Sequence, residues 1–334
     1  MTHIALGACI GEAWLGKQLG KRALFLGAVA QSVPDIDFVS VLWNDPAENL
    51  LAHRGFTHSF LFGLLASFFL ALAAARWQRA HRIRLSRWML FFGAEIMVHL
   101  LLDYFNSYAM GLLEPFSHER FAGDALFVVD PFFSLAPLIA FLVLWRLPVW
   151  HRRRRGWWKV AVVLPGAYLL YCGLNKMEVT RETRRALQEQ QVSHKRFFTT
   201  PTPLNNWLWY VVAENDSGFF VGFHSILADK KNIDFTFFPR NDHLIEPLRK
   251  FEEMQDLLRF SQGYYTAEMW SDTLVFNDLR FGQIIGWHDP REKFVFHYFV
   301  GRGADANKLV VQRGRFARWT WPTTRSMLRR IRGD

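Results

Sequence analysis

Three ionisable residues at helical spacing lie in one of the apolar stretches of the sequence. Glu95, His99 and Asp103 follow one another at intervals of four within "EIMVHLLLDYF", so a helix would carry all three on one face. Imidazole and carboxylate groups are the ligands expected for zinc, iron or manganese. Ionisable groups inside a membrane are costly and are functional there by default. The spacing therefore predicts a metal site on this helix.

Further ionisable residues lie near the ends of neighbouring apolar runs. They are His3, Asp35, Asp37, His53, His58 and Asp130. Three or more histidines and three carboxylates suffice for two or three metal ions, and a two-metal site activates water and clamps the oxygens of a phosphoryl or acyl centre. Arg54 and Arg120 would bind phosphate as bidentate donors.

Each of these residues also has a structural interpretation. A lone histidine near a helix end is usually structural. Asp35 suits a turn or a helix cap, and Asp103 and Asp130 suit caps as well. Glu95 can form a hydrogen bond inside a helical bundle, and Arg54 can anchor a loop at lipid headgroups. The gathering of six or seven such residues on one side of a membrane favours the functional interpretation.

The elements that would position these residues are apolar helices. Four runs predict membrane spans: Ser59–Ala75, Trp88–Tyr104, Pro131–Trp145 and Val160–Leu174. They would be about 23–26 Å long, and tryptophans near their ends would complete the ~30 Å core. Ile4–Gly16 and Ala23–Pro34 predict a tight hairpin of two more short helices, with small faces at Gly7 and Gly11. Residues 1–175 are therefore expected to form an α-helical membrane bundle of about six short spans.

Basic residues are unequally divided between the two sides of such a bundle. One side holds three basic loops, whereas residues 1–3, 35–58 and 105–130 contain only Arg54 and Arg120. The positive-inside rule puts the basic loops in the cytoplasm. The protein would be a multi-pass protein of a bacterial inner membrane. Its candidate site, both termini and the C-terminal region would then lie on the side of the membrane that faces away from the cytoplasm. Membrane orientation thereby explains the excess of basic residues, which gives a formal charge of +10, so no nucleic-acid partner is expected.

The C-terminal residues have a different pattern. Residues 176–198 predict a charged helical linker, and residues 199–334 predict a small extracytoplasmic α+β domain with a basic, solvated tail. A hairpin with residues 215–218 at its tip is followed by one amphipathic helix over His243–Gly263. Strands are predicted at Tyr264–Trp270, Thr273–Leu279, Gln283–Trp287 and Lys293–Val300. This domain would cover the metal site as a lid or select the substrate.

Several motifs carry a family resemblance. "THIALGACIG", "GAVAQSVPDIDFV", "HRGFTHSFLFGLL", "HLLLDYFNSYAMGLLEPFS" and "RFAGDALFVVDPFFSL" together resemble the bacterial inner-membrane metal-dependent hydrolases of the LexA-regulated, YdjM-like family. The pattern is more distantly similar to zinc-dependent phospholipase C and the P1-type nucleases. The resemblance implies a phosphoester hydrolase, or one of similar mechanism, with a divalent metal such as zinc. It carries over, as ligand candidates, His3, Asp35 or Asp37, His53, His58, His99 and Asp103.

The sequence thus predicts a membrane-bound metal-dependent hydrolase. Its substrate would be a phosphoester of a lipid or lipid-linked molecule at the outer leaflet, with membrane lipids as partners. Asp37 or Glu95 would take the proton, and Arg54 would hold the phosphate. One alternative is an ion or solute transporter, for which Glu12 and Gln31 would continue a polar pathway. The other is a non-catalytic membrane assembly factor whose outer domain binds a partner.

Overall fold

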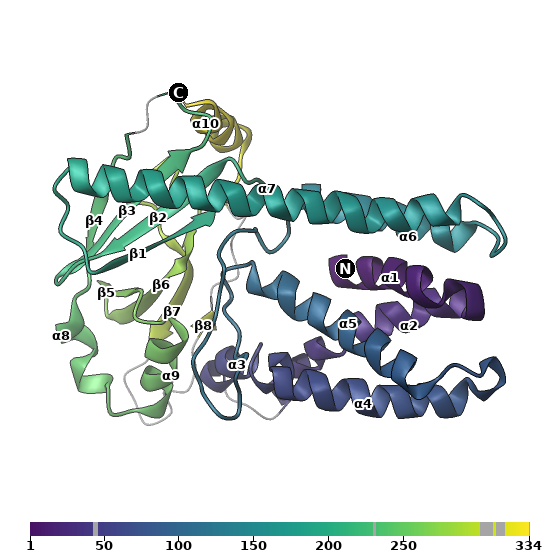
Figure 1. Cartoon of the computed structure of the whole chain (residues 1–334). Helices are drawn as coiled ribbons and strands as arrows, with labels where there is room; N and C mark the ends of the chain where they lie inside the picture. The colour runs from purple at the N-terminus through teal and green to yellow at the C-terminus, as the bar shows by residue number, and fades with distance from the viewer. Residues whose placement is uncertain (43–45, 230–231, 301–309, 312–317, 334) are drawn as a thin grey trace. The chain divides into compact units, whose positions relative to one another are not determined.

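The structure, a computed structural model, describes residues 1–42, 46–229, 232–300, 310–311 and 318–333. It divides into two compact units (Figure 1). Unit 1 contains Met1–Val39 and Ala52–Cys172, and unit 2 contains Ser40–Leu51 and Gly173–Asp334.

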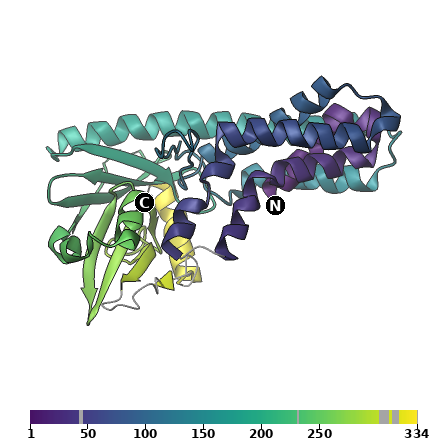
Figure 2. The ribbon, with the colours of Figure 1, turned by 90° about the horizontal axis from the view of Figure 1, so that it is seen from below.

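Unit 1 is helical. Its long elements are α1 (Thr2–Leu19), α2 (Lys21–Ser32), α4 (Phe60–Trp77), α5 (Leu85–Tyr104), α6 (Pro131–Arg146) and the first half of α7 (Arg154–Glu189). Short elements join them: η1 (Pro34–Leu42), whose last three residues belong to unit 2, η2 (Phe56–His58) and η3 (Arg79–His81). The short helix α3 (Pro46–Ala52) follows η1 in the chain and belongs, except for Ala52, to unit 2. α1 packs against α2 and α6, and α5 packs against α2 and α4 (Figure 1 and Figure 2).

Local sequence signals explain where several of these helices begin and turn. The Ser59 side chain accepts a hydrogen bond from the Phe62 amide at the start of α4, as an N-cap does. α1 and α2 form the expected hairpin, because glycines let their backbones approach closely. A Cβ atom added at Gly27 would lie 2.0 Å from the Gly7 carbonyl oxygen, so a larger residue cannot occupy this crossing.

Among the described residues, α4, α5 and α7 are long and apolar enough to cross a membrane. A fourth candidate span arises if α2 and η1, which meet at a 57° bend, form one broken span, and α6 is a shorter apolar helix. The expected helical region is therefore confirmed, with three or four candidate membrane spans among the described residues. The number of six spans remains a prediction. The last predicted span and most of the charged linker form one continuous helix, α7.

Unit 2 contains two four-stranded antiparallel sheets. The first has the order β1-β2-β3-β4 and consists of β1 (Arg196–Pro201), β2 (Leu208–Glu214), β3 (Gly218–Ser225) and β4 (Thr236–Pro239). The second has the order β5-β6-β7-β8 and consists of β5 (Tyr265–Trp270), β6 (Thr273–Gln283), β7 (Phe294–Val300) and β8 (Val310–Val311). The predicted α+β character and the β2–β3 hairpin are confirmed, whereas the extracytoplasmic placement stays a prediction.

Two predictions for the secondary structure of unit 2 were wrong in detail. The single helix over 243–263 is instead α8 (Asp242–Ile245), η4 (Glu246–Leu248) and α9 (Glu252–Phe260). Pro247 lacks an amide hydrogen, and Phe251 is extended, with φ −84° and ψ 139°, so an α-helix cannot run through them. The strand over 283–287 is absent from the described residues because Gly282, with φ 77°, ends β6 one residue later.

The basic C-terminal segment is not simply solvated. Residues 313–317 lie outside the described residues, but α10 (Trp321–Arg332) is a helix started by a capping box of Thr320 and Thr323. It buries Met327 and Ile331 in the core shared by β2, β3 and β6. The helix α10 therefore carries its arginines together with a buried apolar face. The number of basic residues alone did not reveal this face.

Candidate metal centre

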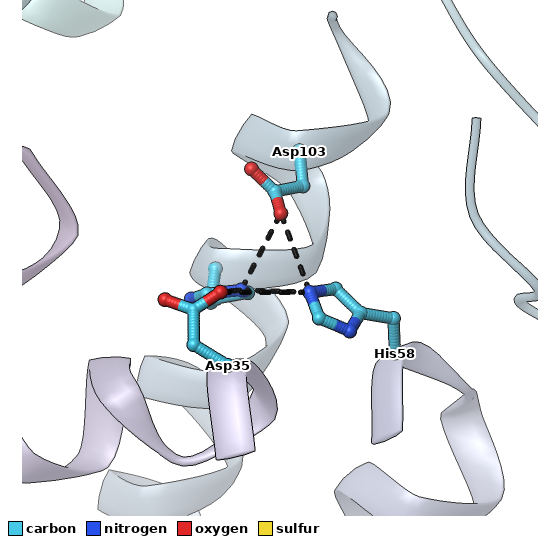
Figure 3. A group of neighbouring side chains, drawn as sticks. Asp35, His58 and Asp103 are labelled. Carbon is cyan, nitrogen blue, oxygen red and sulfur yellow. Dashed lines mark hydrogen bonds and ion pairs between the residues drawn. The ribbon is translucent and has the colours of Figure 1, made fainter. Parts of the chain in front are cut away.

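Four side chains of unit 1 bring their ligand atoms together. They are Asp35 from η1, His58 from η2, and His99 and Asp103 from α5. Figure 3 shows Asp35, His58 and Asp103 pointing toward one another. All four ligand atoms lie within 4.8 Å of one another. The helix α5 supplies two of them because residues four apart share one face.

The distances between these ligand atoms suit a cation with tetrahedral coordination. The Nε2 atoms of His58 and His99 are 3.3 Å apart, and Asp103 Oδ2 lies 3.4 and 3.5 Å from them. Asp35 Oδ1 lies 3.8 Å from His58 Nε2 and 3.6 Å from His99 Nε2. Four ligands around tetrahedral zinc are about 3.3–3.4 Å apart, for bonds of about 2.0–2.1 Å. The donor set therefore fits zinc or a similar cation with little rearrangement.

The second nitrogen of each histidine ligand has a partner that orients the ring. His99 Nδ1 lies 2.6 Å from the Gln31 carbonyl oxygen, which can only accept, so Nδ1 donates and Nε2 keeps its lone pair. His58 Nδ1 lies 3.5 Å from Asp37 Oδ2. Burial lowers the pKa of His58, against the opposing influence of Asp103, and so favours the neutral, metal-binding imidazole. Such outer partners are typical of metal-binding histidines.

Asp103 is shared between the centre and a cationic neighbour. Its Oδ2 atom has no hydrogen-bond partner among the described residues, although Arg54 Nε lies 3.1 Å away as an ion pair. Arg54 Nη1 donates to Asn106 Oδ1 over 2.5 Å, and Asn106 Nδ2 lies 3.4 Å from Asp103 Oδ1. Buried carboxylate oxygens are stable only next to positive charge or hydrogen-bond donors. A single arginine at the edge of the four-donor group provides only part of this compensation.

His3 lies beside this group rather than in it. Its Nε2 is 3.2 Å from Asp103 Oδ1, and its ring stacks on that of His99 with centroids 4.2 Å apart. A cavity of about 30 Å³ adjoins His3, Asp103 and Asn106, which is enough for a water molecule. Asn106 was missed at the sequence level, although its spacing of three from Asp103 places it one turn further along the chain.

Asp37 and His53 also lie outside the four-donor group. Asp37 Oδ2 accepts from the Arg54 amide over 2.7 Å and is 3.2 Å from His53 Nδ1. The left-handed conformation of Arg54, with φ 58°, turns the chain so that His53 and this amide approach the same carboxylate. The His53 side chain is 48% exposed, whereas that of His58 is fully buried.

The remaining candidates have other surroundings. Glu95 is fully buried one turn from His99 but does not belong to the four-donor group, and the side chain of Gln31 is its polar neighbour. Arg120 Nη2 donates to the carbonyl oxygens of His53 and Ala109 over 2.8 and 2.9 Å, so Arg120 links the backbone of two loops. Asp130 accepts from the Phe132 and Phe133 amides, and its prediction as an N-cap is confirmed.

Comparisons with known proteins concern mainly the helical region. The family described as "YdjM inner membrane protein" matches residues 1–179. The chain is 36% identical over 123 residues to inner membrane protein YbcI of Escherichia coli (strain K12), which covers 36% of this chain and 69% of that protein. It is 25% identical over 232 residues to uncharacterized protein YfhP of Bacillus subtilis (strain 168), which covers 66% of each chain. No solved structure gives a significant match.

Proposed function

Because the chain belongs to the YdjM inner membrane protein family, we propose that it is a membrane-bound, metal-dependent hydrolase. The observation that carries the proposal is the group of two imidazoles and two carboxylates at the ends of apolar helices. Asp35, His58, His99 and Asp103 would hold the metal. When bound, a divalent cation polarises a phosphoryl or acyl oxygen and makes water a stronger nucleophile.

Arg54 gives the site its preference for anionic substrates. Its guanidinium is almost fully buried, lies 3.1 Å from Asp103 Oδ2 and bonds Asn106. These contacts fix the plane of the group, and a guanidinium fixed in this way recognises phosphate more specifically than a flexible ammonium does. Arg54 therefore both positions Asp103 and supplies positive charge for a phosphoester.

His53 is better placed than Asp37 or Glu95 to transfer a proton. Asp37 Oδ2 accepts from the Arg54 amide and faces both His53 and His58, so it orients its neighbours. Glu95 is buried away from the four-donor group. The half-exposed ring of His53 is held at Nδ1 by Asp37, which leaves Nε2 for proton exchange, as in other carboxylate–histidine pairs.

The position of the centre suits a lipid or lipid-linked phosphoester. His58 lies two residues before α4 begins, and Asp103 lies in the last turn of α5. Both helices are candidate spans, so the donors are at the level where a bilayer presents its headgroups. A headgroup would reach the site while its acyl chains remain in the membrane. The positive-inside distribution supports the outer leaflet.

The surroundings of Glu12 favour hydrolysis over transport. The transporter alternative requires polar groups that continue through the bundle. Arg154 instead holds Glu12 through two hydrogen bonds of 2.8 and 2.6 Å. It also donates to the Leu144 and Leu147 carbonyl oxygens. Glu12 thereby joins α1 to the α6–α7 connection, which supports a structural role for this buried charge.

Activity after metal removal tests the proposal. The purified full-length protein would be treated with a chelator, then supplied with zinc or manganese and assayed on phosphate mono- and diesters with lipid and soluble leaving groups. We expect hydrolysis that disappears with the metal and returns with it. Arg152→Gln, a substitution of an exposed arginine in the α6–α7 connection, serves as the control for handling. Activity that survives complete metal removal would refute the proposal.

A further inference from the structure

A second cavity opens at the other end of α4 from the metal centre. Its volume is about 410 Å³, within the range of small-molecule pockets. It is lined by the first turns of α2 and by the ends of α4 and α6, through Lys21, Arg22, Phe25, Trp77, Gln78 and Trp145. We call this set the basic cavity. α4 has 18 residues and is about 27 Å long, close to the thickness of a bilayer core.

The basic cavity combines cationic and apolar groups. Lys21 and Arg22 are its charged residues, and no acidic side chain lines it among the described residues. Phe25, Trp77 and Trp145 are each more than half exposed. Tryptophan at the end of an apolar helix is typical of the membrane–water interface. The cavity therefore offers positive charge beside a broad aromatic surface at the depth of lipid headgroups.

The two cations are held at the cavity wall. Lys21 Nζ donates to the Trp145 carbonyl oxygen over 2.6 Å. An ammonium has three N–H donors, so this bond fixes Lys21 and leaves it able to bind a ligand. Arg22 Nη1 lies 3.5 Å from Gln78 Oε1, a long contact that orients the guanidinium without consuming its other donors. The basic cavity thus presents two positioned donor groups.

We propose that the basic cavity binds the headgroup of an anionic phospholipid. The phosphate would accept hydrogen bonds from Lys21 and Arg22, and the upper acyl chains would lie on Phe25 and the two tryptophans. Basic pockets between membrane helices are suited to such headgroups. The aromatic walls distinguish a lipid from free phosphate, because inorganic phosphate has no apolar part to bury. This site is separate from the proposed hydrolytic centre and does not depend on its activity.

Native mass spectrometry of the full-length protein in detergent tests the proposal. Phosphatidylglycerol and phosphatidylcholine would be offered together, and retained lipid would be counted per protein. We expect selective retention of phosphatidylglycerol. Lys21→Gln combined with Arg22→Gln should weaken it about thirty-fold, or roughly five-fold per basic side chain. Arg152→Gln combined with Arg153→Gln is the matched control, since it removes two exposed charges from the α6–α7 connection, outside the cavity.

Each outcome decides the question. Equal loss in both double variants would mean diffuse charge attraction, and unchanged retention in the cavity variant would place the lipid elsewhere. Either result overturns the proposal. Equal retention of the two lipids by the unmodified protein would overturn it too, and this measurement needs no variant to fold. Displacement of the lipid by millimolar inorganic phosphate would contradict the role given to the aromatic walls. Metal content, measured in parallel, reports on the other site.

Discussion

Glutamine in place of His58 should weaken metal binding strongly, whereas glutamine in place of His53 should weaken it only slightly. The two residues make a matched pair, because they are five positions apart and both face Asp37. His58 Nε2 lies 3.3–3.8 Å from the ligand atoms of His99, Asp103 and Asp35. Among the described residues His53 is not part of that group.

The expected magnitudes follow from these positions. Loss of an outer partner typically weakens metal binding about 10–100-fold. Loss of one of four direct ligands should exceed the upper end, so His58→Gln should weaken binding by more than about 100-fold, or about 2.7 kcal/mol. His53 acts on the centre only through Asp37, so His53→Gln should weaken it by no more than about tenfold. As the proposed proton-transfer group, His53 should instead affect turnover about 10²–10⁴-fold.

The assay separates metal from chemistry. Metal content of the purified variants would be measured by elemental analysis, affinity by competition with a chelator, and turnover at saturating metal. Melting temperature checks folding, because His58 is fully buried. Asp35→Asn provides a second ligand substitution at a half-exposed residue and should also lower metal content. The reasoning is refuted if His53→Gln loses as much metal as His58→Gln, or if neither loses any.

Three further predictions concern other parts of unit 1 and the topology. Asp103→Asn should lose metal and activity, and should destabilise the protein by about 3–5 kcal/mol because Arg54 loses its buried partner. Asp130→Asn should keep its metal, since asparagine caps helices as well as aspartate does. Equal metal content in the two variants would contradict the ligand assignment. Arg54→Lys keeps the charge but cannot reach Asp103 and Asn106 together, so KM should rise about 10–100-fold with little loss of metal; a silent variant in steady-state kinetics would mean that Arg54 only anchors the loop. Alkaline phosphatase fused after Asp334 should be active, and fluorescence of a green fluorescent protein fused there would contradict the proposed orientation.

The elements that depend on near neighbours in the chain could be predicted from the amino-acid sequence. Apolar runs mark α4, α5 and α6, and Asp130 marks the start of α6, since an N-cap acts on amides two or three residues away. The interval of four likewise predicts that His99 and Asp103 project from one helical face. The family motifs extend this inference to the whole helical region, and the match over residues 1–179 confirms the family.

Only the tertiary structure separated the members of the candidate set. Glu95 shares its helical face with His99, yet η1 and η2 meet α5 nearer its end, so Asp35 rather than Glu95 joins the four-donor group. Both His53 and His58 are histidines just before an apolar run, and sequence spacing does not distinguish them. The left-handed turn at Arg54 directs the half-exposed His53 toward the buried carboxylate of Asp37, whereas His58 is buried beside Asp103. Such choices depend on backbone segments tens of residues apart in the chain, whose approach is governed by packing. Local spacing therefore predicts the kinds of ligand in this protein, whereas packing decides which of them share one ion.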